Sequence, residues 1–208
     1  LRRPGEVLES GFATVLAAGP GLGHSAEALD LLKQAIAADL PLVLDADALN
    51  LLAAHPVLAG HQQKRAAPTL ITPHPLEAAR LLGIDIAEVR ADRIAAALAL
   101  AKRLNALTVL KGCGSVIASP SGHWHINTSG NPGMATAGMG DVLAGIASAL
   151  LAQGWQAEAA LLCAVHLHGA AADSLVGRGI GPIGLTADET IDAARRVFNA
   201  WIHPQHET

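Results

Sequence analysis

The stretch TSGNPGMATAGMGDVLAGIASALLAQG, residues 128–154, is the most informative part of this 208-residue chain. Its glycines lead into an apolar run typical of a helix, and Asp141 stands where the two meet. Such a loop exposes free amides at the positive end of the helix dipole, where phosphate groups bind. Asp141 could cap the helix or act as a general base beside the anion. Four glycines within eleven residues exceed what a cap needs, so we predict the functional role.

Apolar strand patterns alternate with helical patterns along the rest of the chain. We expect strands within 12–23, 40–47, 68–75, 107–112, 115–120 and 122–127, the last two as a hairpin. We expect helices at 26–39, 48–55, 76–83, 86–105, 141–153, 157–176 and 187–202, with Pro56 closing the second helix and a polar loop at 60–67. Continuously apolar strands separated by helices predict an α/β fold, a mostly parallel sheet covered by helices on both faces. We expect one domain over 1–208, with ligands at the carboxyl ends of its strands.

The composition excludes several classes of protein. Hydrophobic residues make up 51% of the chain and charged residues 15%, which fits a globular protein. The net charge is −4 and there are no basic runs, which argues against nucleic-acid or membrane partners. Cys113 and Cys163 are too few for a disulfide framework, so we expect a cytoplasmic protein. His166 and His168 would point to different faces of a helix, and His123 and His125 lack a third ligand. We therefore predict no metal site built by the protein alone.

Polar or glycine-rich motifs follow four of the predicted strands. They are GPGLG (19–23), DADALN (45–50), TPHPLE (72–77) and KGCGS (111–115). Each has a structural alternative: a tight turn, helix capping by Asp47, a surface-loop His74, or a Glu77 that complements a helix dipole. Lys111 between a strand and glycines could meet a phosphate, although the spacing differs from that of the P-loop.

Taken together and in this order, these motifs resemble the ADP-dependent NAD(P)H-hydrate dehydratases, and so does the stretch NPGMATAGMGDVLAGIASALLAQG. This family is a branch of the ribokinase-like superfamily. It also forms the C-terminal domain of bifunctional NAD(P)H-hydrate repair enzymes. The resemblance covers residues 12–190. It implies a ribokinase-like fold and a hydro-lyase that passes a phosphoryl group from ADP or ATP, with Mg²⁺, to the hydroxyl of hydrated NADH or NADPH. Phosphate then leaves and the reduced dinucleotide is restored. His74, where related vitamin-precursor kinases carry Asn, favours the dehydratase.

The resemblance also implies roles for individual residues. Asp141 would be the catalytic base, and Glu77 would organise magnesium through water. The dinucleotide substrate would contact Gly21, Gly23, Asn50, His74 and Asp141. The adenine nucleotide would contact Lys111, Gly112, Cys113, Gly114, Ser115, Gly138 and Gly140.

The chain departs from the family pattern at three places. Met139 replaces the usual Thr or Ser, and Leu76 replaces the usual Gly. The family carries a further strand, glycine loop and helix before the segment that matches Phe12, so we expect a sheet lacking its N-terminal strand and helix. An exposed sheet edge and the family's habit predict a homo-oligomer, a tetramer. Two alternatives remain: a kinase of a hydroxymethyl or hydroxyethyl heterocycle, and a nucleotide-binding fragment without activity.

Overall fold

A computed structural model describes residues 11–203. Within this range six strands form one sheet, in which their spatial order follows the chain. The strands are β1 (Leu16–Ala18), β2 (Leu42–Leu44), β3 (Thr69–Ile71), β4 (Leu107–Leu110), β5 (Val116–Ala118) and β6 (Trp124–Ile126). The first four are parallel, and β5 and β6 continue the sheet antiparallel. The mostly parallel sheet and the β5–β6 hairpin are therefore confirmed.

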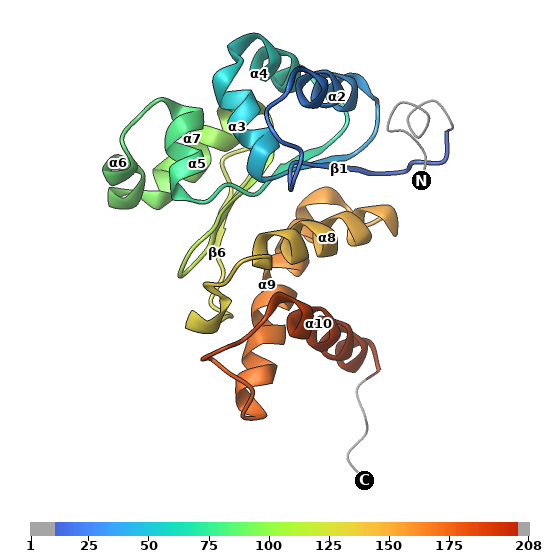
Figure 1. Cartoon of the computed structure of the whole chain (residues 1–208), viewed down its shortest axis with the longest axis vertical. Helices are drawn as coiled ribbons and strands as arrows, with labels where there is room; N and C mark the ends of the chain where they lie inside the picture. Colours follow the sequence, from blue (N-terminus) through green and yellow to red (C-terminus); the bar gives the residue numbers. More distant parts are fainter. Residues whose placement is uncertain (1–10, 204–208) are drawn as a thin grey trace.

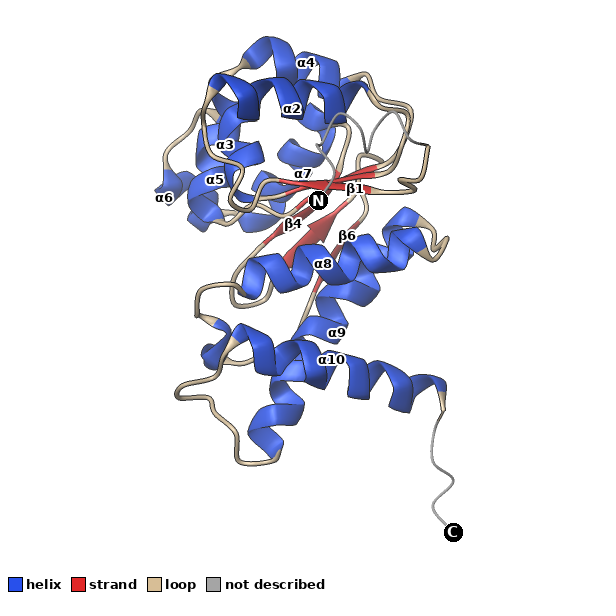
Figure 2. Ribbon diagram, turned by 45° about the vertical axis from the view of Figure 1, so that its right-hand side comes forward, coloured by secondary structure: helices blue, strands red, loops and turns tan. Residues whose placement is uncertain are grey.

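Helices cover both faces of the sheet (Figures 1 and 2). One face carries α2 (Ala26–Ala37), α3 (Ala46–Ala54), α4 (Pro56–Gln63), α5 (Pro75–Leu82), α6 (Ile86–Ala91) and α7 (Arg93–Leu104). The other carries α8 (Met139–Ala152) and α9 (Ala157–Gly177), on which α10 (Ala187–Ile202) packs in turn, and a 3-10 turn, η1 (Pro132–Met134), precedes α8. This is the three-layer arrangement expected for strands that are apolar on both sides.

Alternate residues of the central strands supply the two cores. Leu42 and Leu44 of β2 pack into the core beneath α2 to α7, whereas Val43 between them packs against α8 and α9. All three side chains are buried. The core residues are mostly Ala, Leu, Val and Ile, as the scarcity of aromatic residues predicts.

Two helix predictions were wrong in detail. α3 does end before Pro56, at Ala54 with His55 as its C-cap, but no loop follows directly: Pro56 also opens α4, because proline is tolerated in the first turn, where its missing N–H has no intrahelical partner. The single helix expected at 86–105 is two helices. Asp92 interrupts it in a non-helical conformation, and its side chain accepts a hydrogen bond from Ala95 N at 2.8 Å, which caps α7.

By length and composition α9, with 21 residues, could cross a membrane. It packs instead against α8, α10, β3 and β4, and it contributes Leu161, Ala164 and Val165 to the core. An apolar helix enclosed in this way is a core helix.

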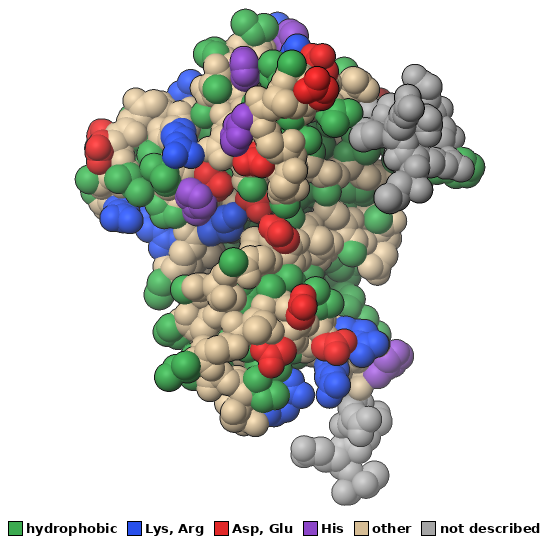
Figure 3. Space-filling model, viewed as in Figure 1, with side chains coloured by type: hydrophobic (Ala, Val, Ile, Leu, Met, Phe, Trp, Pro, Cys, Tyr) green, Lys and Arg blue, Asp and Glu red, His purple; other side chains and the backbone are tan. Residues whose placement is uncertain are grey.

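The carboxyl ends of β2 and β4 meet the N-terminal end of α8. The side chains that follow these strands include Asp45 and Lys111. In Figure 3, charged side chains of both signs and histidines lie close together along the middle of one face. The polar motifs of the sequence are therefore gathered at one edge of the sheet, where parallel α/β proteins bind ligands.

Candidate active site

The site is built on an ion pair between two strand ends, in which the carboxylate is buried and the lysine partly exposed. Asp45, directly after β2, is 2% exposed, and its Oδ1 accepts a hydrogen bond from Nζ of Lys111 at 2.7 Å. Lys111 directly follows β4. Ala46 begins α3 with a φ of 47°, in the left-handed region, where an alanine is strained. Strained residues of this kind cluster at functional sites.

Capping by Asp47, the structural alternative for DADALN, is wrong. Asp45 occupies the N-cap position of α3, but its side chain does not cap the helix because it binds Lys111. The Oδ2 of Asp47 accepts a hydrogen bond from Gly23 N at 2.8 Å. Asp47 therefore ties the glycine turn after β1 to the start of α3.

Gly140 brings the first turn of α8 against the ion pair. A Cβ atom at this position would lie 3.1 Å from Oδ2 of Asp45 and 3.3 Å from Nζ of Lys111. Both separations are shorter than ordinary van der Waals contact, so a side chain here would force Asp45 or Lys111 to shift by a few tenths of an ångström. The free amides at the start of α8 and the Lys111 ammonium thus converge on one point, a combination that favours an anion.

Asp141 follows Gly140 and is exposed. The N-cap of α8 is Gly138, with a φ of 86° and no side-chain capping bond, so the alternative that Asp141 caps the helix is wrong. Among residues 11–203 no hydrogen bond or ion pair engages the Asp141 carboxylate. It is therefore free to accept a proton from a ligand.

His74 and Glu77 hold each other at the start of α5. The His74 Nδ1 accepts from the amides of Leu76 and Glu77, at 3.2 and 3.3 Å, and Glu77 Oε2 accepts from His74 N at 2.8 Å. The remaining ring nitrogen, Nε2, lies 3.2 Å from Glu77 Oε1. His74 is thus fixed, with a half-exposed ring, rather than mobile in a surface loop.

Glu77 is a buried carboxyl beside this cluster. Burial raises its pKa, and the His74 amide and the Lys111 charge oppose that effect. Asp45 adds to the rise because two carboxylates repel each other. Glu77 therefore belongs to the Asp45–Lys111 cluster electrostatically, although the sequence places it in a separate motif.

His168 is a member of the cluster that local sequence patterns did not reveal. Burial and the Lys111 charge lower its pKa to about 4, which keeps the imidazole neutral at physiological pH. Its Nε2 is buried without a hydrogen-bond partner in the described part of the chain. His166, two residues earlier, is exposed and stacks on Trp201 at 5.5 Å, so the two histidines do face apart as predicted.

The KGCGS turn between β4 and β5 has a fixed backbone. Ser115 Oγ accepts from Gly112 N at 3.3 Å and donates to Gly112 O at 3.0 Å. Arg93, from the start of α7, donates to Cys113 O and to Leu110 O. Arg93 was missed by the sequence analysis because no pattern links position 93 to this turn.

The remaining predicted residues lie around this edge. Gly21 and Gly23 adopt left-handed conformations, with φ of 67° and 77°. Asn50 lies on α3, where its Oδ1 accepts from Nη1 of Arg80 at 2.7 Å. Gly114 is left-handed too, with a φ of 63°.

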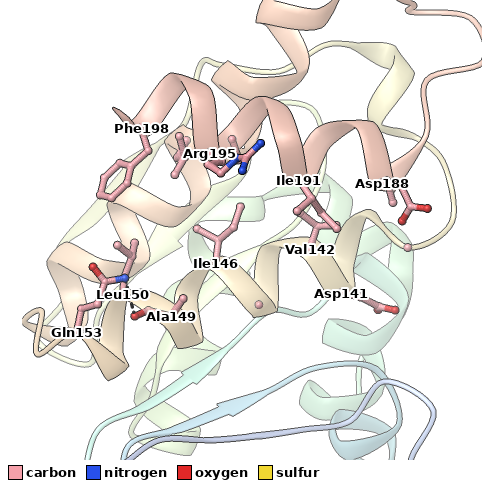
Figure 4. A pocket seen from close by; sticks show the side chains of 15 residues that line it. Asp141, Val142, Ile146, Ala149, Leu150, Gln153, Asp188, Ile191, Arg195 and Phe198 are labelled. Carbon is pink, nitrogen blue, oxygen red and sulfur yellow. Dashed lines mark hydrogen bonds between the residues drawn. The ribbon is translucent and has the colours of Figure 1, made fainter. Parts of the chain in front are cut away.

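A groove of about 530 Å³ runs between α8 and α10. Figure 4 shows Asp141 and Asp188 at one end and Gln153 and Phe198 at the other. Its walls are mostly apolar, with Val142, Ile146 and Ile191 among them. The groove was not predicted, because its two walls come from helices far apart in the sequence. It places Asp141 at the boundary between the anion pocket and an apolar surface.

Comparison with known proteins gives a consistent result. The family model described as NAD(P)H-hydrate dehydratase matches residues 6–195. The chain is 43% identical over 183 residues to the ADP-dependent (S)-NAD(P)H-hydrate dehydratase of Neisseria meningitidis, covering 87% of this chain and 62% of that protein. It is also 43% identical over 187 residues to the bifunctional NAD(P)H-hydrate repair enzyme of Coxiella burnetii, covering 90% of this chain and 37% of that one.

Solved structures agree with the sequence comparison. The ADP/ATP-dependent NAD(P)H-hydrate dehydratase of Bacillus subtilis, co-crystallised with ATP and Mg²⁺, superposes with a TM-score of 0.80 at 32% identity, over 90% of this chain and 66% of that one. The hydroxyethylthiazole kinase of Pyrococcus horikoshii has a TM-score of 0.70 at 17% identity, over 94% of this chain and 77% of that one, and shows the fold alone. The ribokinase-like α/β fold is therefore confirmed.

Proposed function

Because this chain belongs to the NAD(P)H-hydrate dehydratase family, we propose that it dehydrates hydrated NADH and NADPH at the expense of ADP or ATP. One observation carries the proposal. The first turn of α8 meets the Lys111 ammonium at Gly140, which builds an anion pocket, and the unengaged carboxylate of Asp141 stands beside it. Phosphoryl transfer needs this pair of features, a preorganised positive site and a base.

The proposed reaction has two steps. Asp141 accepts the proton of the substrate hydroxyl as its oxygen attacks the terminal phosphorus of the nucleotide, and the bond from phosphorus to the leaving nucleotide oxygen breaks. The resulting ester carries phosphate where hydroxide was. The ring-nitrogen lone pair then expels phosphate from the carbon, with loss of a proton from the ring, and the reduced nicotinamide is restored.

The anion pocket stabilises the charge that develops during transfer. The Gly140 amide belongs to the free N–H groups at the start of α8, and Lys111 supplies a full positive charge. Asp45 holds the ammonium in place and partly neutralises it until a phosphate arrives. The KGCGS turn, with its backbone fixed by Ser115 and Arg93, would bind the rest of the adenine nucleotide.

The dinucleotide substrate would lie on the side of the anion pocket opposite the KGCGS turn. Gly21 presents its backbone amide from the turn after β1, Gly23 lends that turn its left-handed bend while its own amide donates to Asp47, and His74 presents its half-exposed ring. Asn50 already accepts a hydrogen bond from Arg80, so its side-chain amide N–H groups are what it offers a ligand.

Magnesium would be held chiefly by the nucleotide. Within the part of the chain that the structure describes, no group of three acidic, histidine or cysteine side chains could bind a metal ion. Both oxygens of Glu77 face His74, so Glu77 would act on the ion only through water. Phosphate oxygens and water are the ligands that Mg²⁺ ordinarily uses at such sites.

The test is recovery of the absorbance of reduced nicotinamide from hydrated NADH with Mg²⁺ and either ADP or ATP. We expect recovery by the wild-type chain and a loss of at least a hundredfold in Asp141→Asn. Asp188→Asn, at the same end of the α8–α10 groove, is the matched control and should keep the rate. A stable phosphate ester in place of free phosphate would identify a kinase instead, and nucleotide binding without any recovery would indicate a binding fragment.

The chain would act as a homo-oligomer, a tetramer as the family pattern suggests. In support, Ile191, Trp201 and Ile202 leave large apolar side chains exposed on α10. Light scattering after size-exclusion chromatography measures the mass directly, and a monomer at micromolar concentration would contradict the proposal.

A further inference from the structure

The segment 127–138 connects the two halves of the proposed nucleotide site. At its beginning, Asn127 N donates to Ser115 O at 2.9 Å, next to the KGCGS turn. At its end, Gly138 starts α8 and the anion pocket. The distance between these halves must match the length of one nucleotide. Lys111 and Gly140 already join the two halves at the anion pocket, and the anchoring of this segment adjusts how the rest of each half is placed around the same molecule.

One face of α9 anchors the segment. His166, Gly169 and Asp173 follow one another at helical spacings of three and four residues, so they share this face. Ser129 Oγ donates to His166 O at 3.0 Å. A Cβ at Gly169 would lie 2.3 Å from Ser129 Oγ, so only glycine lets the segment approach.

Asp173 makes the most specific of these contacts. Its Oδ2 accepts from Gly130 N at 2.7 Å, and its Oδ1 accepts from Asn131 Nδ2 at 3.0 Å. Asn131 Oδ1 in turn accepts from Gly133 N at 3.0 Å. Each donor thus faces an acceptor, and the orientation of both side chains is fixed. Asp173 contacts no part of the anion pocket itself.

We propose that Asp173 is a positioning residue for the nucleotide, which pins the segment 127–138 to α9 and so sets the KGCGS turn and the first turn of α8 at the right separation. This inference rests on the proposed function, because it assumes that both halves bind one nucleotide. It gives Asp173, the acidic residue of HLHGAAAD (166–173), a role in anchoring the segment 127–138 and none in the reaction itself.

Single substitutions disrupt this arrangement in two different ways. In Asp173→Asn, the new NH₂ group faces the NH₂ of Asn131, so two donors meet. Rotating the Asn131 amide by half a turn would remove that conflict but would place its NH₂ against the N–H of Gly133, which is again a donor facing a donor. In Asn131→Asp, two carboxylates face each other. In the double variant, the amide and the carboxylate exchange places, so all three hydrogen bonds can form again.

The experiment measures the nucleotide dissociation constant by calorimetry for the wild type, both single variants and the double variant, together with KM and kcat where turnover occurs. We expect each single variant to weaken nucleotide binding at least fivefold and the double variant to recover to within twofold. The melting temperature should move little, since these contacts lie at the surface. Asp30→Asn, an exposed acid on α2 paired with Lys33, is the control and should bind normally.

Single variants that bind nucleotide like the wild type would overturn the inference. So would a double variant as weak as the singles, because that would mean that the residues themselves, not their pairing, matter. A wild-type chain that binds nucleotide but restores no reduced dinucleotide contradicts only the proposed function, and the comparison of affinities still decides the role of Asp173. A wild-type chain that binds no nucleotide contradicts both.

Discussion

The Nζ of Lys111 lies 2.7 Å from Oδ1 of Asp45, a residue 66 positions earlier in the chain. The carboxylate is buried, whereas the lysine side chain is 22% exposed. A buried carboxylate needs a partner, and this partner is also the cation nearest the first turn of α8. The same pair therefore stabilises the fold and prepares the anion pocket.

Substituting Lys111 separates these two roles. Lys111→Met leaves Asp45 buried without its counter-charge, so we expect a loss of about 3 kcal/mol in the free energy of unfolding, together with weak nucleotide binding. Adding Asp45→Asn removes the buried charge and should return most of the stability but none of the affinity. Urea unfolding and calorimetry measure the two effects. Recovery of affinity in the double variant would contradict the role of Lys111 in the pocket.

Gly140→Ala is expected to harm binding but not folding. Alanine favours helices over glycine by up to about 1 kcal/mol, and this gain offsets the cost of crowding, so we expect little net change in stability. The new Cβ would crowd Asp45 Oδ2 and Lys111 Nζ, and we expect nucleotide affinity to drop at least tenfold.

Gly145→Ala, one turn further along α8, is the matched control for this substitution. A Cβ at Gly145 would meet nothing within 4 Å, so this variant should be at least as stable as the wild type and bind normally. Equal affinities of the two variants would show that the approach of Gly140 to the ion pair does not matter. Thermal melting and calorimetry make the comparison.

Much of the fold and part of the site could be predicted from the sequence, because both depend on local patterns. Apolar strands and periodic helices repeat at short range, and motifs such as DADALN directly follow strands. What could not be predicted depends on contacts between distant segments. No local pattern shows that Arg93 reaches the turn at Cys113, or that His168 lies close to Lys111.

Local patterns were also misleading where two structures share one signal. Pro56 can end one helix or begin the next, and in the folded chain it does both, following α3 and opening α4. Asp47 has the position and chemistry of a helix cap, but the amide of Gly23 is within its reach in the folded chain. Such alternatives are resolved by tertiary structure, which a single sequence does not contain.

Acid should destabilise the protein through His168. Its pKa is about 4 in the folded chain and 6.5 when unfolded. Its contribution to the free energy of unfolding is therefore fully present above pH 6.5 and is lost as the pH falls towards 4. The shift corresponds to about 3 kcal/mol. Glu77, whose pKa is raised, changes stability in the opposite direction, gaining as the pH falls.

Comparison with His168→Gln isolates this contribution, since Glu77 is present in both proteins. We expect the difference in unfolding free energy between wild type and variant to shrink between pH 6.5 and 4, as measured by urea unfolding at each pH. A difference that is constant with pH would mean that His168 is not held neutral.

Among the glycines that the structure describes, Gly19 should tolerate substitution least. Its φ is 140°, and a Cβ there would lie 1.8 Å from the backbone oxygen of Asp45, an overlap that only movement of the main chain could relieve. Asp45 N donates to Ala18 O at 3.2 Å, so such a movement would separate β1 from the strand end that carries Asp45. We expect Gly19→Ala to cost about 3 kcal/mol or more of stability, or to prevent folding.

Gly21→Ala is the matched control, with a left-handed φ of 67° but open space around its Cβ, and it should cost about 1 kcal/mol from backbone strain alone. Equal melting temperatures for the two variants would show that the close approach of the β1 turn to Asp45 contributes nothing beyond conformational strain.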